Sequence, residues 1–278
     1  MRKFLQLVLS FVRRKRGRAL SDYNKSLEGS GNKRKDIQAI TMSNVHDVEQ
    51  MKYILESCHK NDIHLETIGL QKVWKFVDRI YRMRDFLEKN TENEILIFTD
   101  AYDVFYRDDL DTIKAKFISM DVDIVWSCEK LYSHQIGLDK KFYDNLAGTS
   151  QYKYLNAGGA IGYRDKLLEF YSSIIESLDT EDFNASLCNR EGSNPHTAFD
   201  LTEDDQAIIS HFITLNYEEF GVALDYDCKI FYVPTSDWSD INICKANLGK
   251  FDSSVVHVPY KRKYQYILDA LFYDEYNF

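Results

Sequence analysis

The strongest constraint on the fold is an apolar run that ends in two carboxylates. In "EILIFTDAYDVFYRDD" (94–109), residues 95–98 read as a buried strand, and Asp100 and Asp103 follow at once. Burying an unpaired carboxylate is costly, so these charges need water, a base such as Arg107, or a metal ion beside them. Which of these partners is present decides what the protein does.

The segments around this run alternate between two periodicities. The pattern predicts helices over 46–60, 78–90 and 110–118, and strands over 36–44, 63–70, 94–100 and 122–129. This order predicts an α/β fold in which a mostly parallel sheet is flanked by helices. Ligands of such sheets collect at the carboxyl ends of the strands, where Asp100 and Asp103 stand.

Charge divides the chain into two parts. Residues 1–35 hold 11 Lys or Arg against Asp22 and Glu28, a balance of +9, so residues 36–278 carry −18 of the total −9. We therefore expect a basic N-terminal segment over 1–35 and one folded domain over 36–278. Because nucleic-acid binding needs a basic footprint, the acidic domain argues against a nucleic-acid partner.

The basic segment begins with an apolar stretch, Phe4 to Val12, which precedes the cluster from Arg13 to Arg18. Nine residues are too few to span a bilayer, and in a signal peptide the charge comes before the apolar run. Two interpretations remain. Residues 1–20 form an interfacial helix on an anionic membrane surface, or they are a first helix of the fold followed by a solvated basic linker.

The cysteines bear on the compartment. There are five, an odd number, and no C-x-x-C motif occurs. The spacing predicts neither a disulfide framework nor a zinc site, which favours a reducing compartment. We expect a cytoplasmic protein, with peripheral membrane contact under the first interpretation of residues 1–20.

The common phosphate-binding loops are missing from the sequence. It contains no G-x-G-x-x-G and no G-x-x-x-x-G-K-[ST], and the glycine pair in "YLNAGGAIGY" (154–163) is not at the first β-α turn. Hard divalent cations prefer oxygen ligands, so a metal that bridges a diphosphate to carboxylates is the usual alternative.

Five segments in order carry a resemblance. They are "FTDAYDVFY" (98–106), "YLNAGGAIGY" (154–163), "TEDDQAIISHF" (202–212), "ALDYDCKIFY" (223–232) and "VVHVPYKRK" (255–263). Over roughly residues 36–270 the set resembles the glycosyltransferase domain of the procollagen lysyl hydroxylase/glycosyltransferase (PLOD-like) family. The family's glycine-rich stretches are replaced here by "GLQKVWKFVDRIYR" and by "VPYKRK".

The resemblance implies a single GT-A domain that moves a hexose from a UDP-sugar to a hydroxyl acceptor with the help of Mn²⁺. The family's acceptor is hydroxylysine or glycosyl-hydroxylysine of a collagen-like protein; another glycan is the alternative. The implied metal ligands are Asp100, Asp103 and His257, since a nitrogen and two carboxylates suit Mn²⁺. On spacing alone, the two aspartates are equally consistent with an Asx-capped turn at a strand end.

Further residues are candidates for the donor and the chemistry. Gly158 and Gly159 allow the backbone to pass close to a ligand, and Asn156 would then form hydrogen bonds with hydroxyl groups of the sugar donor. The alternative is that the glycines form a tight turn with no ligand. Asp204 and Asp205 face the sugar, where one of them holds donor hydroxyls or acts as a base, or both merely stabilise a helix start.

The remaining candidates concern the nucleotide. Arg79 is a basic donor contact or part of a solvated helix face. Trp74 and Tyr102 stack on the uracil or belong to the core. Lys261 adds a cation near the diphosphate or lies on a solvated face.

Two other functions compete with the transferase. One is a catalytically silent nucleotide-sugar-binding domain that docks on a membrane or partner through the basic N-terminus. The other is a metal-dependent nucleotidyltransferase, which usually carries a glycine-rich basic loop at the first strand; none follows Ile40. Because Asp100, Asp103 and Asp205 are all intact, we favour the glycosyltransferase.

Overall fold

The computed structural model describes residues 31, 33–43, 49–69, 75–133, 137–188, 201–235, 240–259 and 261–276, without the side chains of 137–138 and 261–262. The predictions for residues 1–20 and for Trp74 therefore lie outside the described residues. The division into 1–35 and 36–278 stays a prediction. Among the described helices, none is long and apolar enough to cross a membrane.

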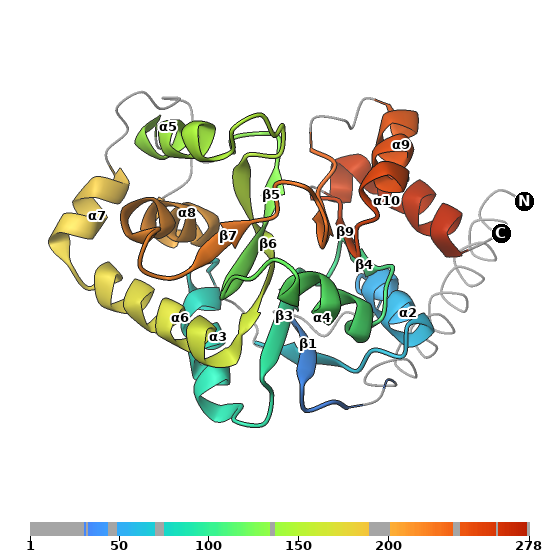
Figure 1. The fold of residues 1–278 in the computed structure, drawn as a ribbon, viewed down its shortest axis with the longest axis horizontal. Coiled ribbons are helices and arrows are strands. Elements are labelled where there is room, and N and C mark those ends of the chain that lie inside the picture. Colours follow the sequence, from blue (N-terminus) through green and yellow to red (C-terminus); the bar gives the residue numbers. More distant parts are fainter. Residues whose placement is uncertain are drawn as a thin grey trace, which may run out of the picture.

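A six-stranded sheet forms the centre of the protein (Figure 1). Its strands, in spatial order, are β2 (Leu65–Ile68), β1 (Ile37–Met42), β3 (Ile95–Thr99), β6 (Tyr154–Tyr163), β5 (Ile124–Glu129) and β7 (Val222–Leu224). All run parallel except β6, which is antiparallel to both of its neighbours. The predicted α/β fold with a mostly parallel sheet is confirmed.

Helices cover both faces of this sheet (Figure 1). One apolar cluster joins it to α2 (Lys52–Lys60) and α4 (Leu110–Ile118). A second and larger cluster joins it to the remaining helices: α3 (Asp78–Lys89), α5 (Gly137–Leu146), α6 (Arg164–Leu178), α7 (Glu181–Cys188), α8 (Asp205–Asn216), α9 (Ile241–Phe251) and α10 (Lys261–Tyr276). The helix predicted over 46–60 begins only at Lys52, because residues 49–51 form a turn.

A small second sheet positions the site. Its strands are β4 (Val104–Tyr106), β9 (Val255–His257) and β8 (Phe231–Tyr232). Strand β4 follows β3 after a short loop and pairs antiparallel with β9, so that Val104 lies opposite His257. This pairing brings the far end of the chain to the loop that carries Asp100 and Asp103.

A buried turn leads the chain from β7 to β8. The Asp225 carboxylate accepts hydrogen bonds from the backbone N–H groups of Lys229 (2.9 Å), Ile230 (2.7 Å) and Phe231 (2.7 Å). Burial raises the pKa of Asp225, although these three donors favour its ionised form. Cys228 takes a left-handed conformation, φ 52°, inside the turn. The "LDYDCKIF" segment thus has a structural role, because its turn places β8 beside β9.

Helix α8, which begins at Asp205, is tied to its neighbours by a buried polar chain. His211 Nδ1 lies 2.9 Å from the Asp139 carboxylate on α5, and its Nε2 lies 2.9 Å from Ser186 Oγ on α7. Asp139 and His211 are almost fully buried, so each satisfies the other's polar group. These hydrogen bonds tie α8 to α5 and α7.

We predict that Asp225→Ala destabilises the fold. The substitution leaves three backbone N–H groups without their acceptor, at a cost of about 1–3 kcal/mol for each one that stays buried. Urea unfolding should show a loss of several kcal/mol relative to the wild type. The matched control is Asp227→Ala, an exposed aspartate in the same turn, which should be near neutral. Equal effects of the two substitutions would contradict this role of Asp225.

Candidate active site

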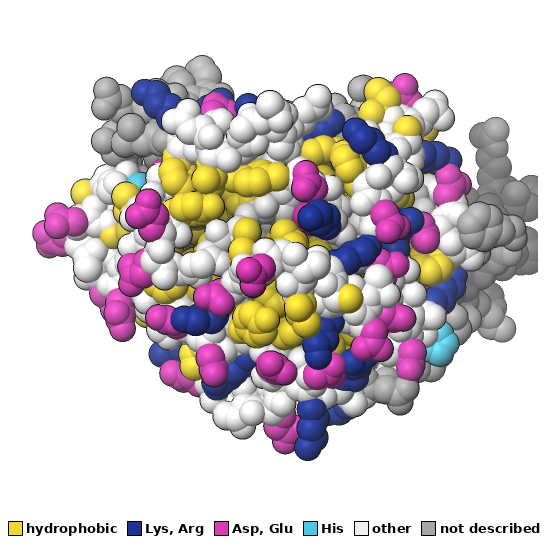
Figure 2. Space-filling model, viewed as in Figure 1, with side chains coloured by type: hydrophobic (Ala, Val, Ile, Leu, Met, Phe, Trp, Pro, Cys, Tyr) yellow, Lys and Arg dark blue, Asp and Glu magenta, His cyan; other side chains and the backbone are white. Residues whose placement is uncertain are grey.

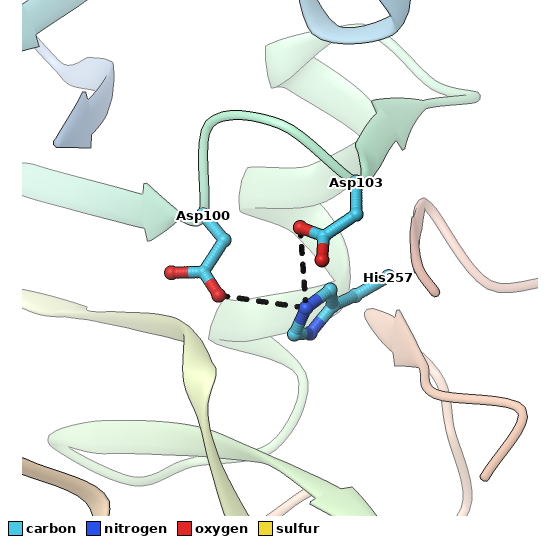
Figure 3. Close-up of side chains that lie close together, drawn as sticks. All are labelled: Asp100, Asp103 and His257. Atoms are coloured by element: carbon cyan, nitrogen blue, oxygen red, sulfur yellow. Dashed lines mark ion pairs between the residues drawn. The ribbon is translucent and has the colours of Figure 1, made fainter. Parts of the chain in front are cut away.

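Three strand ends bring two carboxylates and an imidazole together. Asp100 follows β3 directly, Asp103 precedes β4, and His257 is the last residue of β9. The N–H of Val258 donates to the Asp103 carbonyl at 2.8 Å, which closes the loop against β9. His257 Nε2 lies 3.5 Å from a carboxylate oxygen of Asp100 and 3.5 Å from one of Asp103 (Figure 3).

This cluster has the properties of a cation site. Asp100, Asp103 and His257 each offer a ligand atom within 4.8 Å of the others. His257 Nε2 is buried, has no hydrogen-bond partner among the described residues, and faces the two carboxylates. Burial alone would lower the pKa of His257, but Asp103 and Asp100 outweigh it and raise that pKa. Two oxygens and one imidazole nitrogen fit Mn²⁺.

The glycine pair makes room for this cluster. Gly158 and Gly159 lie inside β6, where the pairing with β5 jumps from Ala160 to Asn156, and neither has a positive φ. The tight-turn interpretation is therefore wrong. A Cβ on Gly158 would stand 2.1 Å from Cε1 of His257, and one on Gly159 would stand 2.8 Å from the Phe231 ring. Gly158 is required because the histidine passes against its backbone.

Arg79 compensates the negative charge behind the cluster. It reaches from the first turn of α3, donates to Asp100 at 2.7 Å and pairs with Asp205 at 3.0 Å. Its guanidinium also lies 5.0 Å from the centre of the Phe98 ring. Burial would lower the pKa of Arg79, but the two carboxylates raise it, so it stays charged. Because Arg79 holds one oxygen of Asp100, the other oxygen faces His257.

The two aspartates at the start of α8 differ from each other. Asp204 is the N-cap and accepts from the N–H of Ala207 at 3.1 Å, and Glu203 ends a preceding 3₁₀ turn (Leu201–Glu203). Asp205 is the first residue of the helix and is 5% exposed. Burial raises the pKa of Asp205 to about 7, against the opposing effect of Arg79. A carboxyl group with a pKa near neutrality has the property that a general base needs.

Three polar side chains near Asn156 were not among the predicted site residues. Asn156 Nδ2 donates to Glu129 at 3.1 Å, and Glu129 also accepts from Ser133 and Gln206. Glu129 is the last residue of β5, and Asp100 directly follows β3, so the rule that ligands collect at strand ends would have found Glu129 too. Gln206 stands inside the "DDQ" that the resemblance rests on, so it too was within reach of the sequence.

The other predicted residues are placed unevenly. Tyr102 lines the cleft, and its hydroxyl lies 2.6 Å from Ser43 Oγ at the end of β1. Lys261 opens α10, but its side chain, like Trp74, lies outside the described part of the chain. The roles of these three residues stay predictions.

Apart from Gly159, every predicted site residue that is described in full lines one cleft of about 700 Å³. Six carboxylates line it, at positions Asp100, Asp103, Glu129, Glu203, Asp204 and Asp205. Besides His257, the basic side chains in the lining are Lys75, which pairs with Glu203, and Arg79. On the outer face drawn in Figure 2, Lys and Arg side chains are instead interspersed with Asp and Glu. Negative charge is thus concentrated where a cation would be held.

The sheet, the cleft at its strand ends and the Asp–Asp–His cluster form the arrangement that the resemblance to a GT-A glycosyltransferase domain predicts. Comparison with known families then gives the particular family. The PLOD GT domain family matches residues 33–184, more than half of the chain's 278 residues. The chain belongs to this family, as the ordered motifs predict.

Two relatives are similar over parts of their length. A procollagen-lysine,2-oxoglutarate 5-dioxygenase of Drosophila melanogaster is 30% identical over 138 residues, which cover 46% of this chain and 19% of the relative. An uncharacterized protein, R699, of Acanthamoeba polyphaga mimivirus is 24% identical over 213 residues, which cover 72% of this chain and 40% of the relative. The chain spans about a fifth of the first relative's length and two fifths of the second's.

Many solved structures are similar to the chain in outline, and one of them serves as an example. It is a glycosyltransferase involved in the glycosylation of the major capsid of PBCV-1, with 10% sequence identity and a TM-score of 0.46. The similarity covers 84% of this chain and 99% of that chain.

We predict that Gly158→Ala disrupts the cation site. The added methyl group would overlap His257 Cε1 and would also stand 2.9 Å from an oxygen of Asp100, so the imidazole must move. Mn²⁺ affinity, measured by the electron paramagnetic resonance signal of free Mn²⁺, should fall by at least ~10-fold, the scale for disturbing metal-ligand orientation.

The control is Gly249→Ala on α9, where an added Cβ meets nothing within 4 Å. It should leave Mn²⁺ binding unchanged. If Gly158→Ala also binds Mn²⁺ like the wild type, the close approach to His257 has no bearing on a metal.

Proposed function

We propose that this domain transfers a hexose from a UDP-sugar to a hydroxyl acceptor, with Mn²⁺ or another divalent cation held by Asp100, Asp103 and His257. The observation that carries the proposal is the buried, unpartnered Nε2 of His257, 3.5 Å from both carboxylates and facing the large cleft. A bound divalent cation would supply Lewis acidity and offset the charge of the departing diphosphate.

Three side chains of the cleft have separate proposed roles in the reaction. Arg79 keeps Asp100 oriented and neutralises part of the charge around Asp205. Asp205 is proposed to contact the sugar or to take the acceptor's proton, because its raised pKa suits a base near neutral pH. One carboxylate oxygen of Asp204 accepts the capping hydrogen bond of α8, which makes Asp204 the weaker candidate for the base.

The acceptor proposal rests on the family and on charge. The fly relative's name states that it acts on procollagen lysine, and the family membership extends the proposal to hydroxylysine or glycosyl-hydroxylysine of a collagen-like protein. A cleft with six carboxylates favours an acceptor that carries positive charge. Another glycan is the alternative acceptor.

Location is a separate proposal. The odd number of cysteines without close spacing supports a reducing, cytoplasmic compartment. The basic cluster within residues 1–20 supports peripheral contact with an anionic membrane. Vesicle binding that weakens steeply with salt, and that is lost when residues 1–20 are deleted, would support the contact; no binding at low salt would exclude it.

Two variants test the proposed reaction together. Asp103→Asn removes a metal ligand, so Mn²⁺ binding and UDP-sugar turnover should both fall, turnover by about 10²-fold or more. Asp205→Ala should keep Mn²⁺ and UDP affinity and lose turnover, because its interaction is made mainly in the transition state. Calorimetric UDP affinity and UDP release from a panel of UDP-sugars, with Mn²⁺ and with EDTA, give the readouts.

The control for both variants is Asp227→Asn, an exposed aspartate outside the cleft, which should match the wild type. A wild type that binds UDP but turns over no UDP-sugar, with or without candidate acceptors, would favour the silent binding domain. Equal loss of UDP affinity and turnover in Asp205→Ala would make Asp205 a structural residue.

A further inference from the structure

A chain of three buried side chains leads from the end of β5 to the cation site. Glu129 accepts from Asn156 Nδ2 at 3.1 Å, and Asn156 Oδ1 lies 3.0 Å from His257 Nδ1. The three residues are 3–4% exposed. Asn156 and His257 are 101 positions apart in the sequence and lie on strands of different sheets, so the tertiary structure brings them together.

The direction of these hydrogen bonds is determined by groups that can only donate or only accept. An ionised carboxylate only accepts, so Asn156 must turn its NH₂ toward Glu129. The backbone N–H of Gly158 only donates, and it donates to Asn156 Oδ1 at 3.0 Å. With Oδ1 thus an acceptor, the His257 Nδ1 atom beside it must carry the hydrogen. In a neutral imidazole the other nitrogen, Nε2, is then bare.

Glu129 also accepts a hydrogen bond from Gln206, whose orientation is determined in the same way. Gln206 Oε1 accepts from the backbone N–H of Ala157 at 2.8 Å, so the NH₂ group of Gln206 faces Ser133 at 2.9 Å and Glu129 at 3.3 Å. Two adjacent backbone N–H groups, at Ala157 and Gly158, therefore favour the same polarity of the network as the Glu129 carboxylate does. This gives the "NAGG" segment a chemical role beyond the space that Gly158 leaves.

We infer that Glu129 is a positioning residue that, through Asn156, holds His257 in the tautomer whose bare Nε2 faces Asp100 and Asp103. The inference rests on the proposed function for its consequence, metal binding, but not for the tautomer itself. Without the carboxylate at position 129, the Asn156 amide loses the partner that requires its NH₂. A rotated amide would present NH₂ to Nδ1 and so favour a hydrogen on Nε2, where a metal must bind.

The test reads the tautomer directly in the metal-free protein. Side-chain ¹⁵N chemical shifts of His257, recorded on the full chain at a pH where the imidazole is neutral, should report the Nδ1–H form in the wild type. Glu129→Gln, whose amide can face either way, should give a mixture. Its affinity for Mn²⁺ alone should fall by about 10–100-fold, the range for losing an outer-shell partner.

A second variant restores the effect by moving the acceptor. In Glu129→Gln/Asn156→Asp, the carboxylate at position 156 can only accept, so it should return His257 to the Nδ1–H form and recover Mn²⁺ affinity. Glu203→Gln is the matched control, because Glu203 is a carboxylate of the same cleft that pairs with Lys75 outside the network. It should leave the tautomer and the affinity for Mn²⁺ unchanged.

The outcomes separate this inference from the proposed function. An Nε2–H wild type, or an unchanged tautomer in Glu129→Gln, overturns the positioning role. If the tautomer is unchanged and only UDP-sugar turnover falls, Glu129 contacts the substrate instead and the inference is wrong. If the tautomer shifts and the double variant restores it while the wild type binds no Mn²⁺, the positioning role stands and the proposed metal dependence fails.

Discussion

The proximity of two carboxylates in a partly buried corner is the constraint on which the surrounding structure depends. Asp100 and Asp103 repel each other, and behind them lies Asp205, whose ionised form is disfavoured by burial and by the nearby Asp100. Arg79 lies between Asp100 and Asp205 and offsets part of this negative charge. The His257 imidazole faces the second carboxylate oxygen of Asp100 and one oxygen of Asp103. Arg79 and His257 leave one face of the cluster directed into the cleft, where a divalent cation would offset the remaining negative charge.

The backbone around this cluster is adapted to His257. The β4–β9 pairing delivers the histidine, the Asp225 turn sets β8 against β9, and the irregularity in β6 lets the imidazole lie against Gly158. The same irregular segment directs two backbone N–H groups at Gln206 and Asn156. The irregular segment of β6 therefore leaves room for the His257 ring and also favours one direction of the hydrogen bonds around it.

The sequence predicted the fold and part of the site for definable reasons. Apolar periodicity identified β3, and the rule for strand ends then gave Asp100 and Asp103 without any knowledge of tertiary structure. His257 came from the resemblance alone, because a short strand that pairs across the molecule leaves no local signal. The glycines signalled close approach, but what approaches Gly158 is a side chain supplied by another strand. Glu129 was missed although it obeys the same rule as Asp100.

Pulsed electron paramagnetic resonance of Mn²⁺ in the presence of UDP tests the central claim most directly. If Asp100, Asp103 and His257 hold a cation that also binds the diphosphate, the spin-echo modulation should contain both ¹⁴N coupling from the imidazole and ³¹P coupling from UDP. His257→Ala should remove only the ¹⁴N component. Phosphorus coupling without nitrogen coupling in the wild type, as Mn²⁺ bound to UDP alone would give, would contradict the account.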